Sequence, residues 1–365
     1  MTQQDILNAL STVQEPDLRQ DLVTLNMIRD ITIEGNYVSF TVVLTTPACP
    51  LKEVIKNDCI KAIKNFNATA VVNVKFTSST TTIRADKKDV LPGVKNIIAV
   101  VSGKGGVGKS TVSANLALAL AQGGARVGLM DADIYGPSVP IMFGVRGERP
   151  MMTSVAEKAM IVPLERYGIK LLSIGLLVDE KNAVVWRGPM ASSAIRQFIT
   201  DVQWGELDYL VIDMPPGTGD IHLTLMQSAP VTGVVVVTTP QDVALADAKK
   251  GIAMFSQAQL NVPIIGLVEN MSYFVPAELP DNKYYIFGKE GGKRLAEEYD
   301  LPFLGQIPLV QGIREGGDIG VPIMVSDDAV TKKAFEEFAG VVARSVSMRN
   351  AHMNSEEVAE VVEER

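Results

Sequence analysis

The chain has 365 residues, of which 47% are apolar and 21% are charged, and its formal net charge is -8. This length predicts two or three domains and excludes a disulfide-stapled miniprotein, while the composition excludes an intrinsically disordered chain. The negative charge offers no general attraction to phosphate backbones or anionic lipid, so we expect no nucleic-acid partner and no membrane partner.

The cysteine content and the apolar runs bear on the compartment. No apolar stretch approaches the ~18 residues of a membrane helix, and residues 1–5 lack the basic start of a signal peptide. Two cysteines, Cys49 and Cys59, are too few for a disulfide framework and are typical of a reducing compartment. We therefore expect a cytoplasmic protein.

The first 85 residues have the pattern of a small α+β domain. The expected elements are a helix over residues 4–13, strands over 27–33 and 37–45, a helix after Pro50 and a strand over 71–76. A polar run and a charged run follow. We therefore predict a domain at residues 1–85 and a linker at 86–95.

From Ile97 onward, short and continuously apolar segments alternate with helix-length segments. This pattern is typical of strands that are buried on both faces of a parallel sheet. It predicts an α/β fold, a doubly wound and mostly parallel sheet over residues 96–348, with a last helix near 329–346 and a frayed acidic tail at 349–365. The expected strands cover residues 97–101, 126–130, 170–174, 209–212, 234–238, 264–268 and 303–307.

A glycine-rich segment between the first of these strands and a predicted helix matches the pattern G-x-x-x-x-G-K-[ST]. In such a loop the backbone N–H groups surround phosphates, Lys109 reaches the β and γ oxygens, and the Ser110 hydroxyl binds Mg²⁺. An ordinary glycine-rich turn would lack the strand, the Lys-Ser pair and the helix. We therefore predict that ATP binds to Gly103, Lys104, Gly105, Gly106, Val107, Gly108, Lys109, Ser110 and Thr111.

Acidic residues follow two other predicted strands, at the sheet edge where ligands bind in open α/β folds. Asp131 and Asp133 follow one strand and Asp213 follows another. Asp213 is predicted to hold Mg²⁺ through water, Gly217 to offer a backbone N–H to the γ-phosphate, and Asp133 to orient the attacking water. The alternative for each aspartate is a solvated carboxylate in a turn. The arrangement predicts an ATPase.

The loop also resembles the deviant Walker A motif of the MinD/ParA/nitrogenase iron protein class, because a second lysine, Lys104, precedes Lys109. The resemblance implies that Lys104 reaches across a nucleotide-sandwich homodimer to the phosphates of the partner. The alternative is a solvated loop lysine.

Longer strings resemble the Mrp/ApbC group of iron–sulfur cluster carrier proteins. They are residues 131–138 (DADIYGPS), 213–220 (DMPPGTGD), 269–272 (ENMS) and 313–318 (IREGGD), with residues 15–18 (EPDL) and 45–50 (TTPACP) resembling a small cluster-assembly domain. The resemblance implies apo iron–sulfur client proteins and cluster assembly proteins as partners. It also implies that Asn270 reads the adenine edge, although an asparagine that caps a turn is an ordinary alternative.

The chain departs from this family where a Cys-x-x-Cys is usual. Residues 273–280 read YFVPAELP, so the usual four-thiolate cluster site of two protomers is absent. Cys49 precedes a helix predicted to begin near Leu51, whose N-terminus is expected to lower the pKa of the thiol. A cluster or metal contact of Cys49 and a structural thiol both stay open, and a second Cys49 could come from a symmetric dimer.

The other residues that could ligate a metal are expected to have structural roles or are assigned no role. Cys59 is expected to pack inside the helix. His222 is expected to start a helix, and His352 to be solvated near the tail. Glu278 and Asp281 suit hard cations better than an iron–sulfur cluster, and we assign them no role.

The leading hypothesis is an ATP-hydrolysing iron–sulfur cluster carrier or assembly protein that acts as a nucleotide-switched homodimer. One alternative is an ATP-dependent scaffold that delivers clients without a cluster of its own. The other is a positioning ATPase of the MinD/ParA kind, which would need an amphipathic membrane-binding tail or a basic DNA-binding surface.

Overall fold

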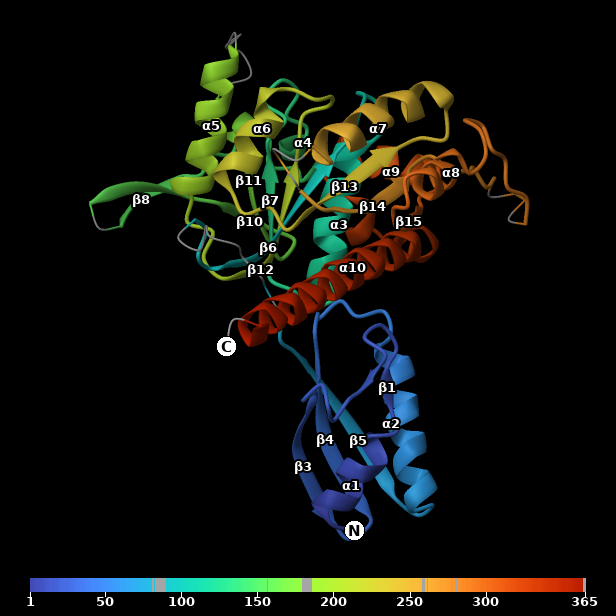
Figure 1. Ribbon diagram of the computed structural model, residues 1–365. Helices are drawn as coiled ribbons and strands as arrows, with labels where there is room; N and C mark the ends of the chain where they lie inside the picture. The colour runs from blue at the N-terminus through green and yellow to red at the C-terminus, as the bar shows by residue number, and fades with distance from the viewer. Residues whose placement is uncertain are drawn as a thin grey trace. The chain divides into compact units, whose positions relative to one another are not determined.

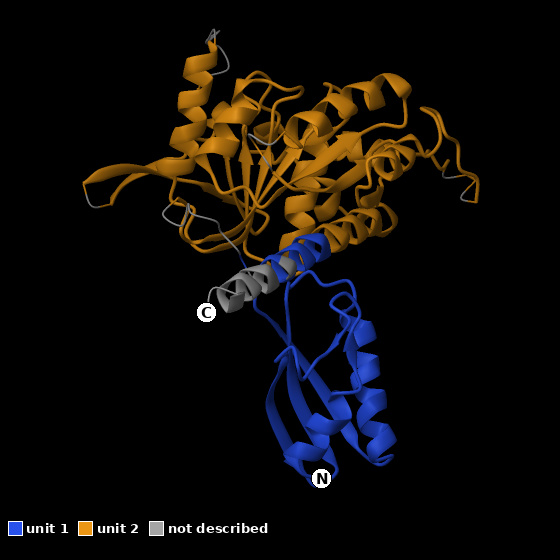
Figure 2. Cartoon of the chain, in the orientation of Figure 1, with its two compact units in different colours: residues 1–83, 343–365 blue, residues 84–342 orange. Residues whose placement is uncertain are grey.

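The computed structural model divides the chain into two compact units, residues 1–83 with 343–365, and residues 84–342 (Figure 2). The residues that it describes are 1–80, 82, 90–155, 157–178, 186–257, 260, 262–276, 278–279 and 281–363, with backbone only for 352 and 354–363. The predicted linker lies partly outside the described residues, at 86–89, whereas Val94 and Lys95 already belong to a strand.

The first unit is a small α+β fold, as predicted (Figure 1). Its main sheet has the order β3-β4-β5, in which β4 pairs antiparallel with β3 and parallel with β5. Ile55, Cys59 and Ile63 recur every four residues on α2, so they share one buried face toward the core. The elements are α1 (Gln3–Leu10), β1 (Gln14–Glu15), β2 (Gln20–Asp21), β3 (Ile28–Glu34), β4 (Tyr37–Leu44), α2 (Lys52–Phe66) and β5 (Val71–Ser78).

The described residues of the second unit form an eight-stranded sheet with the order β10-β11-β7-β12-β6-β13-β14-β15. Every neighbouring pair is parallel except β10 and β11. The predicted doubly wound, mostly parallel sheet is thus confirmed. Its strands are β6 (Val94–Val101), β7 (Val127–Asp131), β10 (Leu164–Arg166), β11 (Ile169–Ser173), β12 (Leu207–Asp213), β13 (Gly233–Thr238), β14 (Ile264–Glu269) and β15 (Phe303–Gln306).

Helices cover both faces of this sheet (Figure 1). Crossovers between parallel strands are right-handed. Helices that connect strands toward one edge of the sheet therefore lie on the opposite face from helices that connect strands toward the other edge. Helix α3 accordingly packs under β7 and β12, while α7 and α8 pack along β13 and β14. The helices are α3 (Lys109–Gln122), α4 (Val139–Met142), α5 (Gly188–Thr200), α6 (Asp220–Ser228), α7 (Asp242–Phe255), α8 (Gly291–Glu298), α9 (Gln311–Ile319) and the short η1 (Ile174–Leu176) and η2 (Ile323–Val325).

The central strands are buried because both faces are covered. All residues of β7, β12 and β13 are buried, and their side chains are mostly valine, leucine and isoleucine. Full burial of each such side chain stabilises the fold by about 1.5–3 kcal/mol. The continuous apolar runs of the sequence are therefore explained by position in the middle of the sheet.

Several features depart from the sequence-based expectation. The hairpin of β8 (Met151–Val155) and β9 (Lys158–Val162) was not expected, and neither was the edge strand β10. The prediction that the last helix ends near Val346 is wrong, because α10 runs over Ala329–Glu363 and takes in most of the tail predicted to be frayed. No glycine or proline follows Gly340, and alanine, methionine and glutamate favour helix.

Among the described residues, no helix combines the length and the apolar character that crossing a bilayer requires.

Candidate active site

The glycine-rich loop lies where the sequence places it, between the end of β6 and the start of α3. Gly106 and Gly108 have φ values of +83° and +81°, a left-handed backbone that favours glycine. The loop turns around a cavity of about 220 Å³. The lining residues include Lys104, Gly105, Gly106, Gly108, Lys109, Ser110 and Thr111, together with Asp133 and Pro216.

Gly103 and Gly108 also allow close approaches of other elements. A Cβ on Gly103 would lie 2.1 Å from the backbone oxygen of Asp247 on α7, so this glycine serves packing. A Cβ on Gly108 would lie 2.3 Å from Nδ2 of Asn270. The Asn270 amide in turn donates to the Val107 carbonyl at 2.8 Å. In the structure Asn270 therefore braces the loop, and its reading of adenine remains a prediction.

Lys109 and Asp213 form the polar centre of the site. Nζ of Lys109, the first residue of α3, lies 2.8 Å from Oδ1 of Asp213 at the end of β12. The Ser110 hydroxyl donates to Oδ2 of the same carboxylate at 2.5 Å. Asp213 is fully buried and Lys109 is 6% exposed, so each charge is compensated by the other. The structure thus brings together the lysine and the serine of the motif and the aspartate predicted from its position after a strand.

Ser113 is a member of this cluster that sequence reasoning missed. Its hydroxyl lies 2.7 Å from Oδ1 of Asp213 and is fully buried. It follows Lys109 by four residues and so lies on the same face of α3. That spacing was the available signal, but serine is common in helices and carries no signature by itself.

Asp133 lies beside this pair on the loop after β7. Its Oδ2 is 3.5 Å from Nζ of Lys109, so one ammonium group faces two carboxylates. Burial raises the pKa of Asp133, and the charge of Lys109 opposes this effect. The predicted partners of the phosphate chemistry therefore meet at one edge of the sheet.

Asp131 holds the loop that carries Asp133. Its carboxylate accepts from the Ser173 hydroxyl at 2.8 Å, from the N–H of Asp133 at 3.1 Å and from the N–H of Val139 at 3.4 Å. Burial and the neighbouring carboxylate of Asp213 raise the pKa of Asp131, and the hydrogen bonds from Ser173 and from the N–H of Asp133 oppose this effect.

Gly217 lies on the loop between β12 and α6 with a φ of +88°. Its N–H donates to the carbonyl of Ser102 at 2.9 Å. Its predicted role as a donor to a γ-phosphate therefore requires that this bond is exchanged, and the role remains a prediction.

The donor set fits the nucleotide and the Mg²⁺ that such a loop implies. In the part of the chain that the structure describes, the N–H groups of Gly106 and Gly108 donate to no protein acceptor. Both residues line the cavity, and unpaired backbone N–H groups at such a cavity are typical of phosphate-binding loops. The hydroxyl of Ser110 and the carboxylate of Asp213 are hard oxygen donors of the kind that Mg²⁺ prefers.

Cys49 lies in the other unit, near the start of α2. It is half-buried and borders a small cavity together with Glu15, Asp17 and Arg344. Burial, with the carboxylates of Glu15 and Asp17, raises the pKa of the Cys49 thiol. The expectation of a lowered pKa is therefore wrong: loss of hydration and nearby negative charge outweigh the hydrogen bond from the backbone of Leu51.

The remaining ligand candidates take structural positions or stay unassigned. Cys59 is fully buried in the core, as predicted, and burial raises the pKa of its thiol to about 12. His222 is the third residue of α6 and accepts the N–H of Gly219. The side chain of His352 lies outside the described residues. Within the described ranges, no cluster of three or more His, Cys, Asp or Glu side chains is arranged to hold a metal.

Two family models match the two parts of the chain. The model described as NUBPL iron-transfer P-loop NTPase matches residues 93–343, and the model described as iron–sulfur cluster assembly protein matches residues 3–76. The first match contains the phosphate loop and both aspartates of the site, and the second contains Cys49.

The relatives agree with these models. An iron–sulfur cluster carrier protein from Synechocystis sp. is 52% identical over 351 residues, which cover 95% of this chain and 99% of the relative. One from Deinococcus radiodurans is 47% identical over 347 residues, with coverages of 94% and 95%.

A solved structure supports the fold of the ATPase part. A nucleotide-binding protein from Archaeoglobus fulgidus, in complex with ADP, is 38% identical and superposes with a TM-score of 0.57. The match covers 67% of this chain and 93% of that protein. The chain therefore belongs to the Mrp/ApbC family of P-loop NTPases, the iron–sulfur cluster carrier proteins.

Proposed function

We propose that this member of the family hydrolyses ATP and works as a nucleotide-switched homodimer that passes iron–sulfur clusters to apo client proteins. The observation that carries the proposal is the meeting of Lys109, Ser110, Asp133 and Asp213 around one phosphate-binding loop. The ADP in the related Archaeoglobus protein supports the choice of an adenine nucleotide.

The loop and Lys109 bind the phosphates in this proposal. The N–H groups of the loop and the N-terminus of α3 surround the β-phosphate, and the ammonium group of Lys109 turns from Asp213 toward the β and γ oxygens. Ser110 and Asp213 would hold Mg²⁺, and the bound ion would supply positive charge that offsets the charge of the phosphates. Binding of the nucleotide would therefore replace the present contacts of Lys109 and Ser110 with Asp213 by contacts with the phosphates and Mg²⁺.

Asp133 orients the attacking water. Its side chain borders the phosphate cavity, is 12% exposed and lies within 3.5 Å of Lys109. A carboxylate in this position can accept a hydrogen bond from water while Lys109 compensates its charge. Gly217 offers its N–H to the γ-phosphate, and Asn270 contacts the adenine.

Lys104 completes the site of a second protomer. It borders the phosphate cavity on the same loop as Lys109. A lysine supplied by the partner would offset γ-phosphate charge and link hydrolysis to dimerisation. This arrangement makes the dimer depend on the nucleotide.

The cluster is the cargo, and Cys49 is the thiol that we assign to it. The other cysteine, Cys59, is fully buried in the core and cannot reach a cluster without unfolding of α2. Cys49 is half-buried and precedes the first residue of the same helix by three positions. Because burial raises the pKa of the Cys49 thiol, binding of iron would have to displace the thiol proton.

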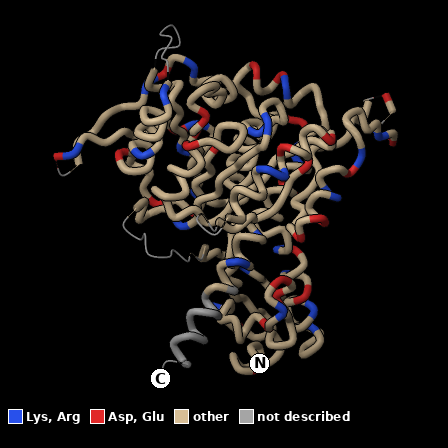
Figure 3. Tube along the Cα trace, turned by 45° about the horizontal axis from the view of Figure 1, so that its top comes forward, with Lys and Arg blue, Asp and Glu red and all other residues tan. Residues whose placement is uncertain are grey.

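A scaffold that delivers clients without holding a cluster is the second candidate. The chain has only two cysteines, so one protomer cannot supply the four thiolates of a common cluster site. A positioning ATPase that binds DNA is less well supported, because Lys and Arg residues are interspersed with Asp and Glu residues along the described trace (Figure 3).

The ATPase is tested by measuring phosphate release from Mg-ATP by the wild type and by Lys109→Ala. We expect loss of about 10²-fold or more in the variant, because a donor aimed at transition-state charge is removed. Lys250→Ala is the matched control, since this lysine is exposed on α7 and pairs only with Asp247 in the described structure. Wild-type activity in purified Lys109→Ala would refute the assignment of the loop.

The cargo is tested by measuring iron and acid-labile sulfide per protomer after anaerobic reconstitution. We expect both in the wild type and in Cys59→Ala, and neither in Cys49→Ser. Equal absence from all three proteins would favour the scaffold that carries no cluster.

A further inference from the structure

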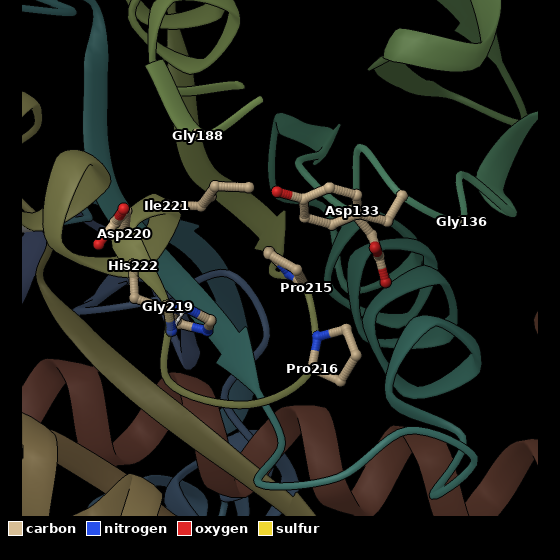
Figure 4. A pocket seen from close by; sticks show the side chains of 10 residues that line it. Asp133, Gly136, Gly188, Pro215, Pro216, Gly219, Asp220, Ile221 and His222 are labelled. Atoms are coloured by element: carbon tan, nitrogen blue, oxygen red, sulfur yellow. Dashed lines mark hydrogen bonds between the residues drawn. The ribbon is translucent and has the colours of Figure 1, made fainter. Parts of the chain in front are cut away.

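Residues of the loop 214–219 border two cavities. One is the phosphate cavity, and the other has a volume of about 400 Å³ and is bordered by Tyr135, Pro215 and His222 (Figure 4). Asp133 and Pro216 border both cavities. A change of the loop on the phosphate side would therefore also alter the lining of the cavity that His222 borders.

The loop must change its hydrogen bonds if Gly217 is to meet a phosphate. In the structure its N–H donates to Ser102 at 2.9 Å, and one N–H cannot serve both acceptors at full strength. Asp213 at one end of the loop is fixed in β12, and Asp220 at the other end begins α6. The rearrangement is therefore confined to the residues between them.

His222 already holds one end of this loop. Its Nδ1 accepts the N–H of Gly219 at 3.3 Å, and its ring packs against Phe255 with 6.2 Å between ring centroids. The side chain is fully buried, and burial lowers the pKa of the imidazole to about 4. The ring is therefore neutral at pH 7, and because Nδ1 accepts, its proton is on Nε2.

The Nε2–H group is left without a partner among the described residues, although it is buried. Buried donors are nearly always paired, so an orphan of this kind calls for a physical explanation. The candidate acceptor on the loop is the backbone of Pro215, whose interaction with the ring favours the charged imidazole but does not outweigh burial, so that the pKa of His222 stays low. Pro215 and Gly219 border the same cavity as His222 (Figure 4).

We propose that His222 is a positioning residue that spans the loop of residues 214–219. Its Nδ1 keeps the hydrogen bond from the N–H of Gly219, and its Nε2–H donates to the Pro215 carbonyl once the N–H of Gly217 no longer donates to Ser102. The imidazole then ties both ends of the loop, and the N–H of Gly217 is held in place between them. This inference rests on the proposed function, because it is the γ-phosphate of bound ATP that draws the N–H of Gly217 away from Ser102.

The direct test uses the small number of histidines. The chain has two, His222 and His352, so a protein labelled with ¹⁵N-histidine gives one ring signal of interest and one internal control. On addition of Mg²⁺ and a non-hydrolysable ATP analogue, we expect the Nε2–H proton of His222 to shift downfield and to exchange more slowly with water. Unchanged His222 signals in a sample that binds the analogue would overturn the proposal.

Two substitutions test the role in turnover. Replacement by an apolar ring in His222→Phe removes both hydrogen bonds, and we expect kcat to fall about 10- to 100-fold with the KM for ATP nearly unchanged. His222→Gln, which retains a donor and an acceptor, should restore most of kcat. A His222→Phe protein with wild-type kcat, or a His222→Gln protein as slow as His222→Phe with equal thermal stability, would contradict the role.

These readouts separate the inference from the function on which it rests. A wild type that binds ATP but releases no phosphate would remove the proposed hydrolysis, while the histidine signals would still report whether the loop closes on Nε2. If His222→Phe does not fold, the comparison of wild type with His222→Gln and the histidine signals still decide the question.

Discussion

At the phosphate site, single side chains already have partners that a bound nucleotide must replace. Lys109 contacts the carboxylates of both Asp213 and Asp133, and Ser110 donates to Asp213. A buried charge without an opposite charge beside it is costly, so these contacts stabilise the site without nucleotide. When the phosphates bind, their negative charge takes over the pairing with Lys109. Binding is thus an exchange of partners between groups that are already in place.

His222 also makes folding stability depend on pH. Burial lowers its pKa from 6.5 to about 4, so below pH 6.5 the unfolded chain takes up a proton that the folded chain does not. The free energy of unfolding should therefore fall as the pH drops from 6.5 toward 4, by at most about 3 kcal/mol. Urea unfolding of the wild type and of His222→Gln across this range measures the difference, and parallel curves for the two proteins would contradict the burial of a neutral ring.

Much of the site was predictable at the residue scale, because the residues of a phosphate loop are consecutive. Lys109 and Ser110 follow from the motif, and Asp133 and Asp213 follow from their position after buried strands. Ser173 was not predictable, because only the register of β11 against β7 places it beside Asp131. The pKa of Cys49 was mispredicted because burial and the carboxylates of Glu15 and Asp17 are properties of the folded unit.

At the scale of elements, the phosphate loop is packed against α7 through a glycine. A Cβ on Gly103 would meet backbone atoms of Asp247 at 2.1 and 2.2 Å, and backbone cannot give way as a flexible side chain can. We expect Gly103→Ala to lower the free energy of unfolding by about 2 kcal/mol or more and to impair ATP binding.

A second glycine, on α7 itself, provides the control. Gly251 is inside the helix, and a Cβ there would meet nothing within 4 Å. Gly251→Ala should therefore raise stability by about 0.5–1 kcal/mol, since alanine favours helix over glycine. Chemical denaturation of both variants checks the pair, and a stable Gly103→Ala protein would disprove the close packing.

The central strands were predictable at this scale because full burial leaves a continuous apolar run. The edge strand β10 has three residues and pairs through the turn at Tyr167 and Gly168, so its pattern is too short to identify. The end of α10 was mispredicted because acidic composition suggested a frayed tail. The segment contains no glycine or proline that would break a helix. Strong patterns thus predicted the elements, while edges and ends depended on tertiary context.

At the scale of the whole molecule, the proposed dimer depends on Lys104. We expect the wild type to dimerise with Mg²⁺ and a non-hydrolysable ATP analogue, and Lys104→Ala to bind the analogue yet remain monomeric, because the partner's phosphates lose a cation. Sedimentation velocity with and without the analogue checks this, with Lys250→Ala as the control. A nucleotide-dependent dimer of Lys104→Ala would contradict the crossing lysine.

The central claim is that ATP hydrolysis at this site governs delivery of an iron–sulfur cluster. The most direct test is the rate of cluster transfer from the reconstituted protein to an apo iron–sulfur protein, followed by visible circular dichroism, with ATP, with a non-hydrolysable analogue and without nucleotide. We predict that ATP changes the rate for the wild type and leaves Lys109→Ala unaffected. Equal wild-type rates under all three conditions, or no cluster to transfer, would contradict the account.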